Sequence, residues 1–213
     1  MLLYSKFIFS SKTDENIFIN ASVIPDKQLV EEIISLKEDE SLHGNGCIIA
    51  IKTKKNNFIK DPETINYDFK EKKYEKSFLK INNLWDIFLF NAEAIKRDFE
   101  ILTSNRKSQI PDKSNGIINA ENIFIEEGSR VRFSILNAES GPIYIGKNAE
   151  IMENSAIRGP FALCNDSTVK MSSKIYGATT IGPYSKVGGE INNSVIFGYS
   201  NKAHDGFLGN SVI

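Results

Sequence analysis

The residue of this chain best suited to proton transfer is a histidine, His204. A neutral imidazole takes up a proton near neutral pH, and His204 has Lys202 and Asp205 as close neighbours. It is the only histidine after residue 115, since the other, His43, lies in the earlier part of the chain. His204 could equally be a corner residue that bonds a neighbouring segment, and residue type alone leaves both interpretations open.

A second residue with a chemical use is Arg158, because a guanidinium pairs well with phosphate oxygens. An ordinary surface charge is the alternative interpretation. The two cysteines, Cys47 and Cys164, lie in segments of different character, with neither a disulfide framework nor a metal-binding spacing. We therefore expect reduced thiols, a cytoplasmic protein and no metal site built from the repeats.

The segment that must position these side chains carries a strict six-residue repeat. A period of six fits neither an amphipathic helix nor an alternating strand, but it fits a parallel β-helix in which each hexad forms one flat side of a coil. In each hexad, the position four residues after the repeated aliphatic residue mostly holds a small residue, with Phe161 as the exception. The repeated aliphatic residues, which we call the ladder, are Ile145, Ile151, Ile157, Leu163, Val169, Ile175, Ile181 and Val187.

The ladder also predicts where the candidate residues point. Ile125 and Val131 fit a first coil, and after a slip the spacing resumes at Ile196, Lys202 and Leu208, giving about five coils. Arg158 takes a small-residue place beside Ile157 and should project outward. Lys202 occupies a ladder position, where a charge needs a partner; turning outward at a wider corner would let it meet a phosphate.

Composition divides the chain near residue 115. Of the 14 glycines, only Gly44 and Gly46 precede Gly116. Residues 1–115 predict a mixed α/β part that ends in a linker, and residues 116–213 predict the β-helix. In the first part we expect strands at 4–10, 17–23 and 46–53, helices at about 26–36 and 83–103, a core position for Trp85 and a solvated lysine-rich surface at 70–80.

The overall charge excludes two classes of partner. The formal net charge is −1, which gives no electrostatic case for nucleic acid or an anionic membrane. The N-terminal stretch lacks a signal-peptide pattern, and no apolar run approaches membrane-spanning length.

Several motifs together resemble one family. The run from Ile196 to Ile213, with Ser200-Asn201-Lys202-Ala203-His204 followed by Leu208-Gly209-Asn210, is similar to the acetyltransferase coil of the bifunctional enzyme that makes UDP-N-acetylglucosamine. Nearly the whole chain looks like a divergent branch of that family. The further marks are residues 20–23 (Asn-Ala-Ser-Val), 85–88 (Trp-Asp-Ile-Phe), 157–161 (Ile-Arg-Gly-Pro-Phe) and 188–190 (Gly-Gly-Glu).

The resemblance implies two activities. An α/β nucleotidyltransferase part would join UTP and N-acetylglucosamine-1-phosphate with Mg²⁺, and a left-handed β-helix would transfer acetyl from acetyl-CoA to glucosamine-1-phosphate. It also implies a homotrimer formed through the β-helix. It makes His204 the catalytic general base, with Lys202, Arg158 and Asn201 as substrate-binding residues.

The chain departs from that family in three places. No glycine-rich phosphate loop with an arginine precedes Gly44, Phe207 stands where the family has a tyrosine, and no capping element follows the last repeat. We therefore expect a fragment of a longer protein, whose own uridylyl transfer is in doubt. The alternatives are another sugar-1-phosphate nucleotidyltransferase and a non-catalytic trimerising scaffold. A zinc enzyme of the carbonic anhydrase type needs three histidines, and the repeats hold one.

Overall fold

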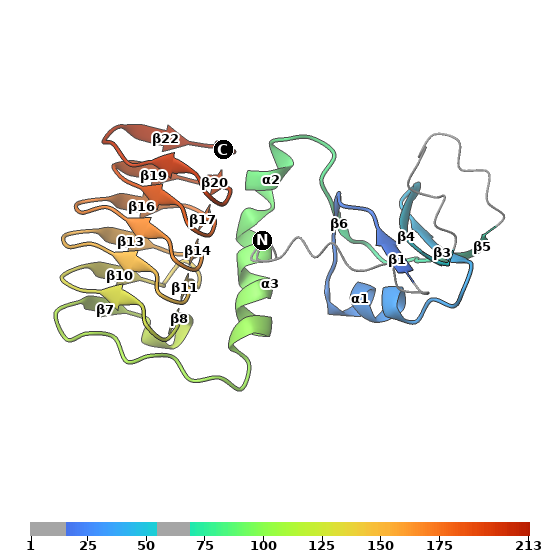
Figure 1. Cartoon of the computed structure of the whole chain (residues 1–213), viewed down its shortest axis with the longest axis horizontal. Coiled ribbons are helices and arrows are strands. Elements are labelled where there is room, and N and C mark those ends of the chain that lie inside the picture. The colour runs from blue at the N-terminus through green and yellow to red at the C-terminus, as the bar shows by residue number, and fades with distance from the viewer. Residues whose placement is uncertain (1–15, 55–68) are drawn as a thin grey trace. The chain divides into compact units, whose positions relative to one another are not determined.

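The computed structural model describes residues 16–54 and 69–213. The chain divides into two compact units, with the division between Asn82 and Asn83. The repeat strands begin at Gly116, where the composition changes, while the helices just before them pack with the repeats (Figure 1).

The smaller unit is an α/β fold built on an amphipathic helix. Asp26 caps this helix by accepting a hydrogen bond from the Leu29 backbone at 2.8 Å, and Leu29 and Ile33 face the core. Two sheets complete the unit, one with strand order β1-β4-β3-β5 and one pairing β2 with β6. The elements are β1 (Asn16–Ile19), β2 (Val23–Ile24), α1 (Lys27–Ile34), β3 (Glu40–Gly44), β4 (Cys47–Thr53), β5 (Lys70–Lys73) and β6 (Leu79–Lys80).

The expected strand at 46–53 and the first helix are confirmed within a few residues, whereas the expected strand at 17–23 is two strands, β1 and β2, which are separated by a turn and belong to different sheets. The expected strand at 4–10 lies outside the described residues. Three strands, β3, β5 and β6, were not predicted.

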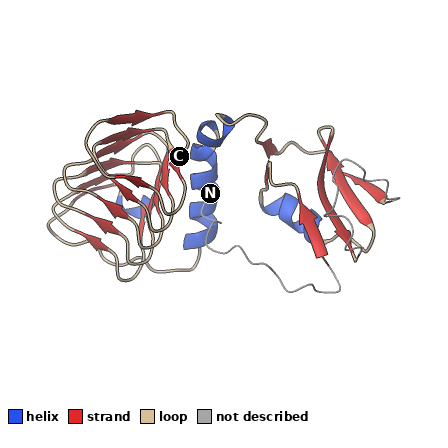
Figure 2. Cartoon of the chain, turned by 45° about the horizontal axis from the view of Figure 1, so that its top comes forward, coloured by secondary structure: helices blue, strands red, loops and turns tan. Residues whose placement is uncertain are grey.

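The larger unit contains a parallel β-solenoid of about five turns. Its strands stack in three sheets, with the orders β7-β10-β13-β16-β19-β22, β8-β11-β14-β17-β20 and β9-β12-β15-β18-β21, which we call the first, second and third sheets (Figure 2). This architecture is consistent with the predicted left-handed β-helix. The elements are β7 (Gly116–Ile118), the 3-10 turn η4 (Ala120–Asn122), β8 (Ile123–Ile125), β9 (Arg130–Val131), β10 (Ile135–Asn137), β11 (Ile143–Ile145), β12 (Glu150–Ile151), β13 (Ala156–Arg158), β14 (Phe161–Leu163), β15 (Thr168–Val169), β16 (Lys174–Tyr176), β17 (Thr179–Ile181), β18 (Lys186–Val187), β19 (Glu190–Asn192), β20 (Val195–Ile196), β21 (Asn201–Lys202) and β22 (Phe207–Gly209).

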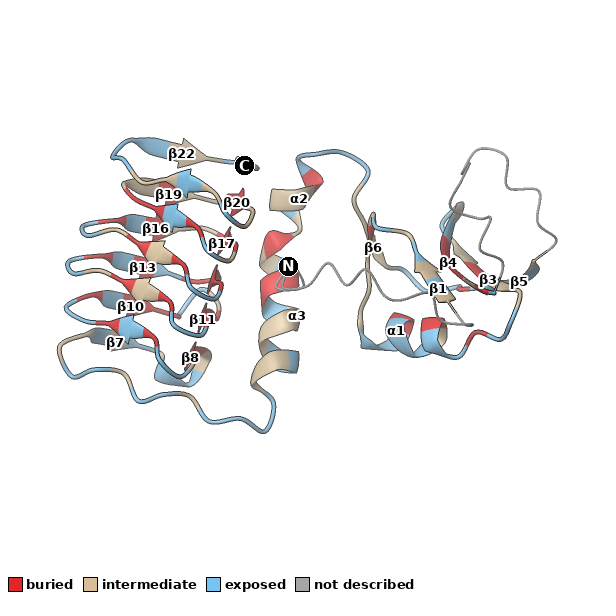
Figure 3. Ribbon diagram, in the orientation of Figure 1, coloured by how far each residue is buried: buried red, intermediate tan, exposed pale blue. Residues whose placement is uncertain are grey.

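All eight ladder residues are buried in the core cluster of the solenoid, as predicted. Figure 3 shows buried segments in every coil of the stack. Phe161 also points inward and is fully buried, so the exception to the small-residue pattern fills the core. The small residues at other corners are largely serines that donate to corner carbonyls; Ser167 Oγ, for example, reaches the Gly182 oxygen at 2.8 Å. Each coil thus combines an apolar centre with satisfied polar corners.

Two helices, α2 (Asp86–Leu89) and α3 (Asn91–Thr103), replace the single helix predicted at 83–103. Helix α3 lies along the second sheet and packs against β17 (Figure 1). Buried Asn91 ties them together, because its Nδ2 donates to the Ala178 oxygen and its Oδ1 accepts from the Thr180 hydroxyl, both at 2.7 Å. The core position predicted for Trp85 is wrong: this side chain is 56% exposed, because it stands before the packed turns of α3.

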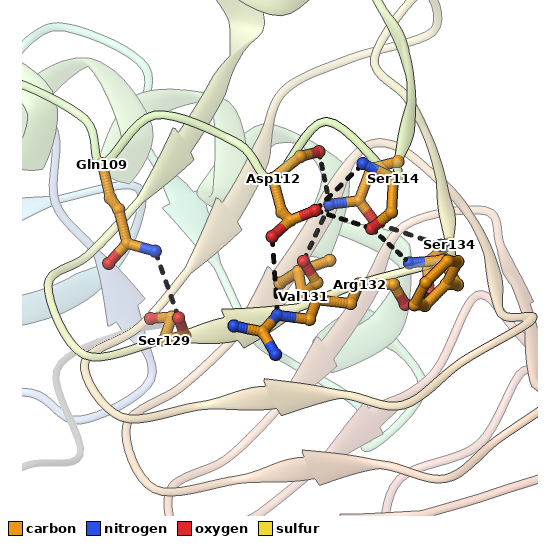
Figure 4. A network of polar contacts seen from close by, with 9 residues as sticks. Gln109, Asp112, Ser114, Ser129, Val131, Arg132 and Ser134 are labelled. Atoms are coloured by element: carbon orange, nitrogen blue, oxygen red, sulfur yellow. Dashed lines mark hydrogen bonds and ion pairs between the residues drawn. The ribbon is translucent and has the colours of Figure 1, made fainter.

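The linker after α3 closes the open backbone of the first coil. Ser108 Oγ accepts from the Ile125 amide at 2.9 Å, and Gln109 Nε2 donates to the Ser129 oxygen at 3.1 Å. Asn115 bonds two more backbone groups, the Val131 oxygen and the Ser134 amide. In Figure 4 the Asp112 carboxylate accepts hydrogen bonds from the amide and the hydroxyl of Ser114, and it forms an ion pair with Arg132. Side chains of the linker therefore form hydrogen bonds to backbone groups of the first coil that a preceding coil would otherwise bond.

Over residues 16–54 and 69–213, none of the helices is both long and apolar enough to cross a bilayer.

Candidate functional site

The corner between β21 and β22 carries the candidate base. His204 and Asp205 are exposed on it, and Gly206 follows with a φ of 118°, a conformation that favours glycine. Within the part of the chain that the structure describes, the imidazole has neither a hydrogen-bond nor an ion-pair partner. The His204 imidazole is therefore accessible to solvent.

The Lys202 side chain starts from the inward-facing ladder position and is half-buried. Its Nζ lies 2.6 Å from the Gly188 oxygen, 2.9 Å from the His204 oxygen and 3.0 Å from the Gly206 oxygen. The predicted need for a partner is thus met by backbone carbonyls, and all three donors of the ammonium are used. Binding a phosphate would require the ammonium to leave at least one of these carbonyls.

Arg158 projects from the outer face of the first sheet into a groove of about 680 Å³. The second coil is longer than its neighbours, and its extra residues meet the turn at Gly159 to form one wall. A side chain at Gly159 would lie 2.1 Å from the Gly141 oxygen, so only glycine allows this approach. The groove is lined by Ile118, Ile135, Asn137, Ser140, Ala156, Ile157, Arg158, Gly159, Pro160, Lys174, Ile175, Tyr176 and Gly177.

Two cationic side chains line this groove. Among residues 16–54 and 69–213, the Arg158 guanidinium and the Lys174 ammonium have no ion-pair or hydrogen-bond partner. Beside them the Tyr176 hydroxyl donates to the Glu190 carboxylate at 2.5 Å. This hydrogen bond raises the pKa of Tyr176, with burial as a smaller cause, so the phenol stays protonated. The groove offers positive charge and apolar walls, a combination suited to an anionic ligand.

The structure brings some of the predicted residues together and separates others. Asn201, Lys202 and His204 share the last coil, but Asn201 points outward from the strand on which Lys202 points inward. Arg158 on β13 is three strand steps from β22, about 14 Å along the stack at the usual spacing. Within one chain, Arg158 and His204 therefore occupy separate places.

Two groove residues, Lys174 and Tyr176, were missed by the sequence analysis. Both flank the ladder residue Ile175, as Arg158 flanks Ile157. Because residues on either side of an inward position lie on the outer face of a strand, the same reasoning that placed Arg158 could have found them.

The smaller unit contains one histidine contact. His43 Nε2 lies 2.9 Å from the hydroxyl of buried Ser41. Over residues 16–54 and 69–213, no cluster of three or more histidine, cysteine or acidic side chains is arranged to hold a metal ion.

Comparison with known proteins supports the nucleotidyltransferase resemblance. Residues 2–107, just under half of the chain, match a family described as sugar nucleotidyl transferase. A search among curated proteins finds no match. The matched segment includes α2 and α3, which pack on the solenoid. The match and the solenoid together fit a hexapeptide-repeat sugar nucleotidyltransferase, and they support a general role as a transferase in sugar-nucleotide synthesis.

Proposed function

We propose that the solenoid transfers an acetyl group from acetyl-CoA to the amine of glucosamine-1-phosphate, with His204 as the general base. The observation that carries this proposal is the accessible His204 imidazole, which has no partner among the described residues, on the corner that resembles an acetyltransferase coil. The cationic groove with Arg158 supports the choice of a phosphorylated substrate.

In the proposed reaction the substrate nitrogen attacks the thioester carbonyl carbon. The carbon–nitrogen bond forms, the carbon–sulfur bond breaks, and coenzyme A leaves as its thiolate. His204 takes the proton released by the attacking amine and returns it to the leaving sulfur. Arg158 and Lys174 would bind the sugar phosphate, and Asn201 would contact substrate from the outer face of β21.

A homotrimer is part of this proposal. The resemblance implies acyl sites between neighbouring subunits, and in one chain Arg158 and His204 lie about 14 Å apart along the stack. Sedimentation of the protein at micromolar concentration tests this directly. A stable monomer would contradict the trimer.

The second proposed activity is uridylyl transfer from UTP to N-acetylglucosamine-1-phosphate. It is supported by the family match over residues 2–107. Mg²⁺ would neutralise the phosphates of UTP, but the described residues show no acidic cluster that fits it. A related alternative is a different sugar-1-phosphate nucleotidyltransferase whose solenoid is a scaffold.

The acetyl-transfer proposal is tested with radiolabelled acetyl-CoA and glucosamine-1-phosphate. Replacing His204 with alanine should lower kcat by about a hundred- to ten-thousand-fold, as expected for loss of a general base. His43→Ala, in the other unit, is the matched control and should leave kcat unchanged. An unchanged kcat for His204→Ala would refute the assignment, and an inactive but trimeric wild type would favour the scaffold.

A further inference from the structure

A column of serines satisfies the corner carbonyls between the third and first sheets. Ser134 Oγ donates to the Met152 oxygen at 3.1 Å, and Ser155 and Ser173 donate to the Lys170 oxygen at 3.1 and 2.6 Å. All three serines are buried. Since a buried carbonyl without a donor is costly, these hydroxyls are part of what holds each corner in place.

The serine column stops before the coil that carries His204. The next two places in the column are Gly189 and Gly206, as the corner hydrogen bonds from Lys174 to Gly189 and from Glu190 to Gly206 show. Gly189 has a φ of 77°, and a side chain there would come within 2.7 Å of the Gly206 oxygen. No hydroxyl can therefore be placed at this corner.

Lys202 supplies the missing donors. The Gly188 oxygen, which follows the Met152 and Lys170 oxygens in the stack, is bonded by the Lys202 ammonium in place of a serine. The same ammonium bonds the His204 and Gly206 oxygens, which lie on either side of Asp205. The Lys202 ammonium thus bonds backbone carbonyls on both sides of the exposed residue Asp205, and the Gly188 carbonyl of the preceding coil.

We propose that Lys202 is a positioning residue that fixes the backbone beneath His204, in place of the serine column. Its catalytic consequence rests on the proposed acetyl transfer, whereas its structural consequence does not. The three converging carbonyls form a site for an alkylammonium ion, which Lys202 occupies as an internal ligand. Removing the side chain beyond Cβ should leave a site that accepts n-propylammonium, which has the length of the deleted atoms.

The structural test uses the imidazole NMR signals of the two histidines, His43 and His204. Lys202→Met keeps the apolar stem and removes the ammonium, so it should shift and broaden the His204 signal and leave the His43 signal unchanged. Lys202→Ala should do the same, and millimolar n-propylammonium should restore the wild-type spectrum. Lys186→Ala is the control: Lys186 is exposed on β18, on the neighbouring strand, and the substitution should change neither signal.

The kinetic test separates this inference from the proposed function. If acetyl transfer occurs, Lys202→Met should lower kcat at least tenfold with an unchanged KM for acetyl-CoA, and n-propylammonium should recover activity in Lys202→Ala.

A wild-type His204 spectrum in folded Lys202→Met would overturn the positioning role. A large rise in the KM for the sugar phosphate, with kcat unchanged, would instead make Lys202 a phosphate ligand. If Lys202→Ala does not fold, the His204 signal of Lys202→Met still tests the positioning role. An inactive wild type with a shifted His204 signal in Lys202→Met would refute acetyl transfer and leave the positioning role standing.

Discussion

Replacing Asn91 with alanine should detach helix α3 from the solenoid. The side chain makes two buried hydrogen bonds, to the Ala178 oxygen and from the Thr180 hydroxyl. Each is worth about 1 kcal/mol, and the stranded groups add a desolvation cost of about 1–3 kcal/mol, so we expect a total loss of about 3–5 kcal/mol. Alanine favours a helix more than asparagine does, so the loss cannot come from helix propensity.

The assay is thermal and urea unfolding followed by the fluorescence of Trp85, the only tryptophan, which lies in the same unit. For a unit of this size, 1 kcal/mol corresponds to roughly 4 °C in Tm, so Asn91→Ala should lower Tm by roughly 12–20 °C. Lys96→Ala, at an exposed position of the same helix, is the control. A double-mutant cycle with Thr180→Val should give a coupling energy of about 1 kcal/mol. If Asn91→Ala and Lys96→Ala unfold within about 0.5 kcal/mol of each other, the reasoning is wrong.

Three further predictions concern the solenoid core. Ile157→Asp should abolish the native circular dichroism of the solenoid, because an unpaired buried charge costs several kcal/mol, whereas Ile135→Asp at an exposed neighbouring position should leave it intact. Ser173→Ala should lower the free energy of unfolding by about 1 kcal/mol in urea titrations, because the Lys170 oxygen then keeps only the 3.1 Å bond from Ser155; an unchanged free energy of unfolding would contradict this. Burial raises the pKa of the Cys164 thiol to about 11 from 9.0. Folding therefore favours the protonated thiol, and this contribution is present below pH 9 and is lost as the pH rises towards 11. At pH 8, Ellman's reagent should label Cys47 but reach Cys164 only on unfolding; rapid labelling of both thiols would contradict this.

The solenoid could be predicted from sequence because one inward aliphatic residue per side is a local rule repeated many times. Residues that obey it, such as Ile157 and Ile175, were placed correctly. The slip after Val187 is the shortening of one coil: Lys186 pairs with Asn201, only 15 positions later, whereas Thr168 pairs with Lys186, 18 positions later. This shortened coil contains Gly189 at the corner position where earlier coils have a buried serine.

The remaining features depend on contacts that no local pattern encodes. Strand β5 is a run of charged residues that pairs in parallel with β3, so neither hydrophobicity nor alternation marks it. Trp85 looked like a core residue by type, but the packing of α3 is set by Asn91 and Ile95. The groove around Arg158 requires the long second coil to fold against Gly159, and the three-carbonyl contact of Lys202 joins residues from two coils.

The linker that closes the first coil also bears on how these molecules can associate. An uncovered end of a parallel stack presents a row of free amides and carbonyls, which can template the strands of another chain. Here Ser108, Gln109 and Asn115 already occupy such groups on the first coil. Several backbone groups that a second molecule would need for strand pairing at that end are therefore already hydrogen-bonded. Filament growth by coil-on-coil addition is therefore disfavoured there, and any ordered assembly through the first coil has to use the flat sides of the prism.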